Sequence, residues 1–250
     1  MLFKFKQRSV TLKLSFILLF MFMITVLSSL GFWQLRRADL KRSIEIALKE
    51  RGSDVPMLIG NNTLNQETDE YRKIIAEGYF DNQHTMLVDN QIYQGQVGYY
   101  ILTPFLYKEN KAILVNRGWI VANSDRQKLP PIESVDSSII TVHGTLYHPF
   151  KKPPFYLGKE EGWESSGWPK LIQYMNLEKL ELELGYSLQP LIIQLDPNQP
   201  NGFARSWSSF LPEMGVQRHI AYAIQWFSMA FIAFGIFIAL IKREINNQNQ

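Results

Sequence analysis

Two long apolar runs, one near each end of the chain, constrain this sequence more than any other feature. The first covers residues 14–33 and the second covers residues 220–241, and neither contains a charged side chain. Twenty residues in a helix rise about 30 Å, which is the thickness of the hydrocarbon core of a bilayer. The first run is too long for the apolar part of a signal peptide and lacks a small-residue cleavage site. We therefore predict two retained transmembrane helices, at residues 14–35 and 219–241.

Two spans place both termini on the same side of the membrane. Basic residues flank both sides of the spans, so the excess of Lys and Arg does not decide the orientation. Long loops cross the membrane largely regardless of their charge, and residues 38–218 carry a net charge of −4. We expect the ends, 1–13 and 242–250, to be cytoplasmic and a domain of residues 36–218 to be external. No Arg-rich amphipathic presequence precedes the first span, which favours a bacterial inner membrane over a mitochondrial one.

The region between the spans has the pattern of an antiparallel sheet, with one or two helices. Short apolar segments alternate with turn residues, and their short connections favour antiparallel neighbours, as in an open sheet or a closed barrel. We predict strands at residues 72–80, 85–89, 98–106, 112–121, 139–147 and 191–195. Helices are expected at 38–51, continuing the first span, and at 176–184, where Gly185 ends the helix. Residues 149–169, rich in Pro, Gly and Trp, predict a long ordered loop. The fold class is thus an α+β membrane protein.

Several functional classes are excluded or disfavoured by what the sequence lacks. There is no cysteine, so thiol catalysis, iron–sulfur clusters and Cys-ligated zinc are excluded. No pair of histidines has the spacing of a metal site on a helix, and no phosphate-binding loop or nucleophile-elbow motif is present. The net negative charge of the central region is opposite to that of a nucleic-acid-binding domain. We expect neither an enzyme nor a nucleic-acid-binding protein.

His219 is the one titratable residue that opens a span. Helical spacing places His219, Tyr222, Trp226 and three alanines on one face, while larger apolar residues, including Phe227, lie on the opposite, lipid-like face. An ionisable side chain at a span is a candidate functional residue, and imidazole is a common ligand of haem iron. The alternative is an interfacial histidine beside Arg218, on a helix whose alanines pack on the first span.

Arg117 is a charged residue in a strand at residues 113–119 whose sequence otherwise predicts burial. A buried guanidinium without a partner is very costly. One interpretation is an internal ion pair that fixes the sheet. The other is a docking point for a partner's carboxylate or a haem propionate.

Five motifs, in order along the chain, carry a resemblance to a known family. They are Leu30-Gly31-Phe32-Trp33-Gln34 with Arg37; Gly78-Tyr79-Phe80-Asp81; Gly98 to Phe105; Val115-Asn116-Arg117-Gly118-Trp119; and Arg218-His219 with Tyr222-Ala223 and Gln225-Trp226-Phe227. Together with the two spans, they resemble the surfeit locus protein one family, over residues 12 to 243. Members of that family are assembly factors for haem–copper cytochrome c oxidase.

The resemblance implies a protein anchored at both ends, with its domain in the periplasm of a bacterium. It implies a part in delivering haem a to oxidase subunit I, with His219 as the suspected iron ligand and Tyr222 and Trp226 beside it. The expected partners are oxidase subunit I, haem a synthase and membrane lipid. The remaining motif residues, Gly31, Trp33, Gln34, Arg37 and residues 116–119, are expected to have interaction or structural roles.

The sequence departs from many relatives at Asp89-Asn90-Gln91, where others have glycine and proline with a basic residue. We expect this difference to alter a turn. Two functions remain open: transient ligation of haem a by His219 during its delivery, and a haem-independent scaffold that stabilises an assembly intermediate of subunit I.

Overall fold

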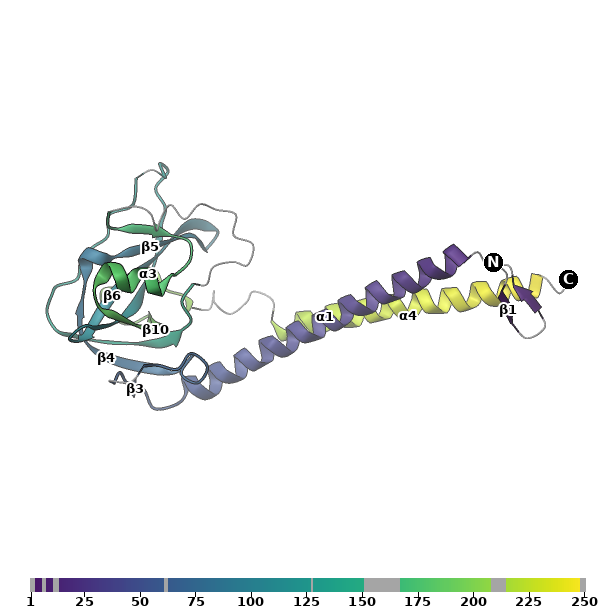
Figure 1. The fold of residues 1–250 in the computed structure, drawn as a ribbon, viewed down its shortest axis with the longest axis horizontal. Coiled ribbons are helices and arrows are strands. Elements are labelled where there is room, and N and C mark those ends of the chain that lie inside the picture. Colours follow the sequence, from purple (N-terminus) through teal and green to yellow (C-terminus); the bar gives the residue numbers. More distant parts are fainter. Residues whose placement is uncertain are drawn as a thin grey trace. The chain divides into compact units, whose positions relative to one another are not determined.

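The computed structural model describes residues 3–5, 8–10, 14–60, 63–126, 128–150, 167–207 and 215–247. The chain forms two compact units, which are visible in Figure 1. One unit comprises Met1–Glu45 with Pro212–Gln250, and the other comprises Ile46–Leu211. Most of the loop predicted at 149–169 lies outside the described residues.

The first unit consists mainly of α4 (Val216–Asn247) and of α1 (Leu14–Gly52) up to Glu45, whereas the last residues of α1 belong to the second unit. Both contain apolar windows long enough to cross a membrane, and little of either window is buried within the protein. Large apolar side chains such as Leu18, Phe22 and Phe231 are exposed along them. Such surface is unfavourable in water and suits a hydrocarbon environment. The two predicted apolar helices are confirmed, although both helices extend beyond the predicted spans.

Two short elements of this unit were not predicted. Strands β1 (Phe3–Phe5) and β2 (Arg8–Val10) pair antiparallel ahead of α1. Three-residue strands carry too short a pattern to be recognised from sequence.

The second unit contains a closed β-barrel. Its ring consists of β4 (Lys73–Phe80), β8 (Ile140–Tyr147), β10 (Ser187–Leu195), β7 (Lys111–Val121) and β6 (Gln96–Lys108). The ring closes where the end of β4 pairs with β6, at Tyr79 opposite Leu106 and Phe80 opposite Phe105. Gly78 permits this closure, because a Cβ there would collide with the carbonyl oxygen of Leu106.

Three further strands extend the sheet from this ring. Strand β5 (Met86–Tyr93) pairs with β6, β9 (Lys170–Ile172) pairs with β5, and β3 (Met57–Leu58) pairs with β4. Most pairings are antiparallel as predicted, but β7–β10, β5–β9 and β3–β4 are parallel. No hairpin turn joins either strand of these parallel pairs to its partner, so no local turn pattern predicts the pairings.

The barrel interior explains why the ring strands are so apolar. One cluster of buried side chains draws on all five ring strands and includes Ile74, Phe105, Val115, Val142 and Ile193. A second cluster on the outer face of the sheet joins β5, β6 and β7 to helix α3 (Leu177–Leu184) through Leu180. Because both faces of β7 are covered, its residues form a continuous buried run rather than an alternating one.

Helix α3 has the termini that the sequence predicted. The side chain of Asn176 accepts a hydrogen bond from the backbone N–H of Lys179 at 3.1 Å, which caps the first turn. Gly185 follows the last turn in the left-handed conformation and bonds back to the carbonyl of Glu181.

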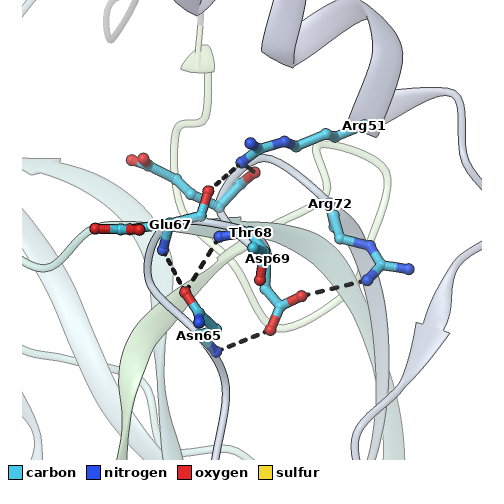
Figure 2. A network of polar contacts seen from close by, with 7 residues as sticks. Arg51, Asn65, Glu67, Thr68, Asp69 and Arg72 are labelled. Carbon is cyan, nitrogen blue, oxygen red and sulfur yellow. Dashed lines mark hydrogen bonds and ion pairs between the residues drawn. The ribbon is translucent and has the colours of Figure 1, made fainter.

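The end of α1 is held by a network of polar contacts within the second unit (Figure 2). Arg51 donates from Nη1 to the carbonyl oxygens of Glu67 and Glu70, at 2.7 and 3.1 Å. The turn that presents these carbonyls is itself fixed, since Asp69 accepts from the backbone N–H of Asn65 and pairs with Arg72 at 3.2 Å. The end of α1 is therefore bonded to a turn, and the side-chain contacts of Asp69 determine the shape of that turn.

The departure at Asp89-Asn90-Gln91 lies inside β5 rather than in a turn. Asn90 has a positive φ of 58°, and the pairing with β6 shifts between Val88 and Gln91, which defines a bulge. The carbonyl of Gln91 accepts a hydrogen bond from Trp119 Nε1 at 2.9 Å. The expected turn is thus wrong: the strand continues to Tyr93, and the residues form a bulge in its pairing with β6, to which β7 contributes the Trp119 hydrogen bond.

Candidate functional site

A hydrogen bond between His219 and Gln34 joins α4 to α1. His219 Nδ1 lies 2.7 Å from Gln34 Oε1, and the two residues are only 5% and 7% exposed. An amide oxygen can only accept, so Nδ1 carries the proton in this contact. In the neutral imidazole the free lone pair then belongs to Nε2. The sequence identified His219 as a candidate iron ligand and Gln34 as a motif residue, but it did not predict that the two side chains are in contact.

Small residues continue the buried face along both helices and let them approach closely. On α4 the buried positions are Val216, His219, Ala223, Ala230 and Ala233. On α1, Gly31 and Ala38 are buried. This is the pattern expected of helix pairs in membranes, where close backbone contact replaces the hydrophobic effect.

Phe227 also belongs to the contact between the helices. A Cβ on Gly31 would lie 2.7 Å from the Phe227 ring, and the rings of Phe32 and Phe227 meet edge to face at 5.2 Å. The prediction that Phe227 lies on the lipid-like face is therefore wrong. Phe227 follows Ala223 by four residues, which places it almost directly above Ala223 on the same face.

Tyr222 and Trp226 border this face instead of filling it. Tyr222 is 44% exposed and Trp226 is half-buried. Helical geometry places both on the same edge of the buried stripe, with Tyr222 about one turn beyond His219. Their rings are accessible for contact with a further molecule.

The motif of the first helix divides between two faces of α1. Gly31 and Gln34 point toward α4, whereas Trp33 is 48% exposed and Arg37 is also exposed. The Arg37 guanidinium lies 5.7 Å from the centre of the Trp33 ring, a cation–π contact at helical i, i+4 spacing. A tryptophan beside an arginine at the end of an apolar run is typical of a membrane interface.

The residues Asn116 to Trp119 belong to the second unit and form a β-bulge in β7. The pairing of β7 with β6 shifts at Arg117, because Gly118 faces Ile101 and Asn116 faces Leu102. Asn116 Oδ1 accepts from the Gly118 backbone N–H at 3.1 Å. Gly118 has φ of +119°, and a Cβ there would lie 2.8 Å from the Ala204 carbonyl oxygen. Trp119 pairs with Ala204 through two backbone hydrogen bonds.

Arg117 is held by carbonyl groups and aromatic rings. It is 2% exposed, and it donates from Nε to the Asn201 carbonyl at 2.8 Å and from Nη2 to the Glu133 carbonyl at 3.0 Å. Its guanidinium also lies over the rings of Phe80 and Phe203, at 5.5 and 5.0 Å. Burial lowers the pKa of Arg117 to about 10, against a smaller opposing effect of the Glu133 charge. Among the residues that the structure describes, no carboxylate is in ion-pair contact with Arg117, and the Glu133 charge acts on it without such a contact.

Sequence reasoning missed the groups that surround Arg117. Phe80 belongs to the motif Gly78-Tyr79-Phe80-Asp81 that the sequence had singled out, so this aromatic residue could have been considered from sequence. Phe203 lies in no motif that the sequence had singled out. The backbone carbonyls of Glu133 and Asn201 have no sequence signal, because any residue supplies a carbonyl. Within the described ranges, no group of three His, Asp or Glu side chains is placed to hold a metal ion.

Comparison with known proteins identifies the family. The model of the SURF1 family matches residues 21–231. A SURF1-like protein of Rickettsia felis is 28% identical over 232 residues, covering 89% of this chain and 95% of its own. A SURF1-like protein of Rickettsia prowazekii is 28% identical over 244 residues, covering 94% and 92%. The yeast cytochrome oxidase assembly protein SHY1 is 32% identical over 104 residues, covering 40% of this chain and 27% of its own. The chain therefore belongs to the SURF1 family.

Proposed function

We propose that this protein is a membrane-anchored, non-catalytic assembly factor for cytochrome c oxidase. The yeast relative is named for oxidase assembly, and the two apolar helices supply the anchor. The proposed location is a bacterial inner membrane, with both termini cytoplasmic and the β-domain in the periplasm.

The proposed mechanism is transient binding of haem a by His219. The observation that supports it most strongly is the hydrogen bond from Nδ1 to Gln34, which leaves the Nε2 lone pair for iron. Metal-binding histidines usually donate their second ring N–H in this way, which fixes the tautomer and the ring orientation. Tyr222 and Trp226, at the edge of the same stripe, would cover a porphyrin face. Here haem a is cargo, received with haem a synthase as the donor and passed to oxidase subunit I.

A haem-independent scaffold is the second candidate, and one observation favours it. His219 is nearly inaccessible in the helix pair, so its role could end with joining α4 to α1. The protein would then stabilise an assembly intermediate of subunit I through its surface.

The two functions are separated by His219→Asn, with His143→Asn on β8 as the matched control. An asparagine amide can replace the Nδ1–H donor to Gln34 but is a poor iron ligand. The full-length variants are purified in detergent after co-expression with haem a synthesis enzymes, and their visible spectra are recorded. Haem delivery predicts a red-shifted haem a band in the wild type and in His143→Asn that is absent from His219→Asn. Colourless wild-type protein, or normal oxidase assembly with His219→Asn, would refute haem handling and favour the scaffold.

A further inference from the structure

A cavity in the β-domain lies beside Arg117. It has a volume of about 410 Å³ and is bordered by Arg117, Trp168, Pro169 and the segment 129–134. A second cavity of about 390 Å³ shares Arg117, Pro131, Glu133 and Ser134 with the first. Volumes of this size are typical of sites for small ligands or single side chains.

The wall of this cavity is fixed rather than loose. The Asn82 side chain forms two hydrogen bonds with the backbone of Val135, at 2.8 and 2.9 Å, just after the segment that borders the cavity. Arg117 itself holds the Glu133 carbonyl. The residues on either side of the opening are therefore positioned before any ligand arrives.

The guanidinium beside the cavity has one donor group to spare. Arg117 Nη1 is buried and has no hydrogen-bond partner among the residues that the structure describes, whereas Nε and Nη2 each have one. Arg117 also forms no ion pair within those residues. An arginine is charged at neutral pH, and the Glu133 charge favours that charged form from an exposed side chain at the cavity rim. A buried guanidinium N–H without an acceptor is nevertheless costly, so the Nη1 donor lacks a hydrogen-bond acceptor in this arrangement.

We propose that the cavity beside Arg117 binds a carboxylate that accepts a hydrogen bond from Nη1. One free donor group suits a monoanion, and the Glu133 side chain at the rim disfavours a more highly charged ligand. The leucine, isoleucine, prolines and tryptophan of the first cavity suit an apolar body behind the carboxylate. The ligand class is thus an apolar monocarboxylate, either a free organic acid or an acidic side chain of a partner polypeptide.

The test measures binding to the full-length protein in detergent by calorimetry. The probes are benzoate, an acetylated and amidated pentapeptide containing one glutamate beside a phenylalanine, and inorganic phosphate. We expect saturable binding of benzoate or of the peptide, and phosphate should bind at least tenfold more weakly. Preference for benzoate would indicate a free organic acid as the ligand, and preference for the peptide would indicate an acidic side chain of a partner. Failure of both carboxylates to bind, or equal binding of phosphate, would overturn the proposal.

Variants at Ser134 keep the test valid even if variants of Arg117 fail to fold. Ser134 is exposed and borders both cavities, so its side chain can change without disturbing the core. Ser134→Glu supplies a competing carboxylate and should weaken binding of the carboxylate at least tenfold relative to the neutral Ser134→Gln. Glu133→Gln removes a negative charge that repels the carboxylate ligand, so it should tighten binding of that ligand severalfold. Equal affinity of Ser134→Glu and Ser134→Gln would contradict the assignment. This inference does not depend on the role of His219.

Discussion

Replacing Gln34 by leucine tests whether its contact with His219 prepares an iron ligand. Leucine has a similar length and removes the acceptor that lies 2.7 Å from Nδ1. Hydrogen bonds between membrane helices are worth about 0.6 kcal/mol on average and about 1.7 kcal/mol at most. Because about 1.4 kcal/mol corresponds to a factor of ten, the helix pair should weaken by about three- to twentyfold.

The effect on haem a should exceed the effect on helix packing. Loss of a group that orients a metal-binding histidine typically lowers metal affinity by about 10- to 100-fold. Without Gln34 the imidazole can rotate and the proton can move to Nε2, the atom that iron requires. We therefore expect Gln34→Leu to bind haem a at least tenfold more weakly than the wild type, while Gln34→Glu, which keeps an acceptor, stays near the wild type.

The assay is a titration of haem a into the detergent-purified full-length proteins, followed by visible absorbance. Thermal unfolding of each variant in the same detergent serves as the control for packing. Wild-type haem affinity in Gln34→Leu would refute the orienting role. Equal losses in Gln34→Leu and Gln34→Glu would also refute it, because the acceptor would then be irrelevant.

Three further predictions concern the β-domain. Gly118→Ala should destabilise the domain by roughly 2 kcal/mol, because φ of +119° is strained for alanine and its Cβ would crowd Ala204, and thermal unfolding measures this loss. Burial raises the pKa of Tyr100 to about 12, so the folded state keeps a proton that the unfolded state releases above pH 10, and stability should fall between pH 10 and 12. Tyr100→Phe should reduce this loss in alkaline unfolding experiments. Arg51→Met should lower stability by about 1 kcal/mol by removing two hydrogen bonds to carbonyls, measured by denaturant unfolding against an exposed control, Arg126→Met.

The sequence predicted the ring strands because their burial leaves a clear pattern. Residues 112–121 carry mostly apolar side chains on both faces of the strand, and in the structure both faces of β7 are buried. The same reasoning missed β3 and β9, which have two and three residues and too little pattern to stand out. It also missed the parallel pairings, because no hairpin turn connects the paired strands and marks the pairing in the sequence.

The candidate site was predictable in its residues but not in its contacts. A polar residue at the end of an apolar run stands out, so both Gln34 and His219 were recognised from sequence. Which polar groups meet depends on the rotation of two helices about their axes, and this follows from the small residues at Gly31 and Ala223. Arg117 shows the opposite limit: its burial was predicted correctly, whereas its carbonyl partners have no signature in the sequence.

The separation of the two partners along the chain has a consequence for how the site forms. Gln34 and His219 are 185 residues apart, and the whole β-domain lies between them in sequence. The hydrogen bond can form only after the second apolar helix has been made and placed beside the first. If that bond sets the Nε2 lone pair of His219, then neither helix alone is a competent ligand. A chain that ends before Val216 should therefore fold its barrel, whose pairings all lie between residues 57 and 195, and yet bind no haem a. Haem binding by such a truncated chain would show that the site lies elsewhere.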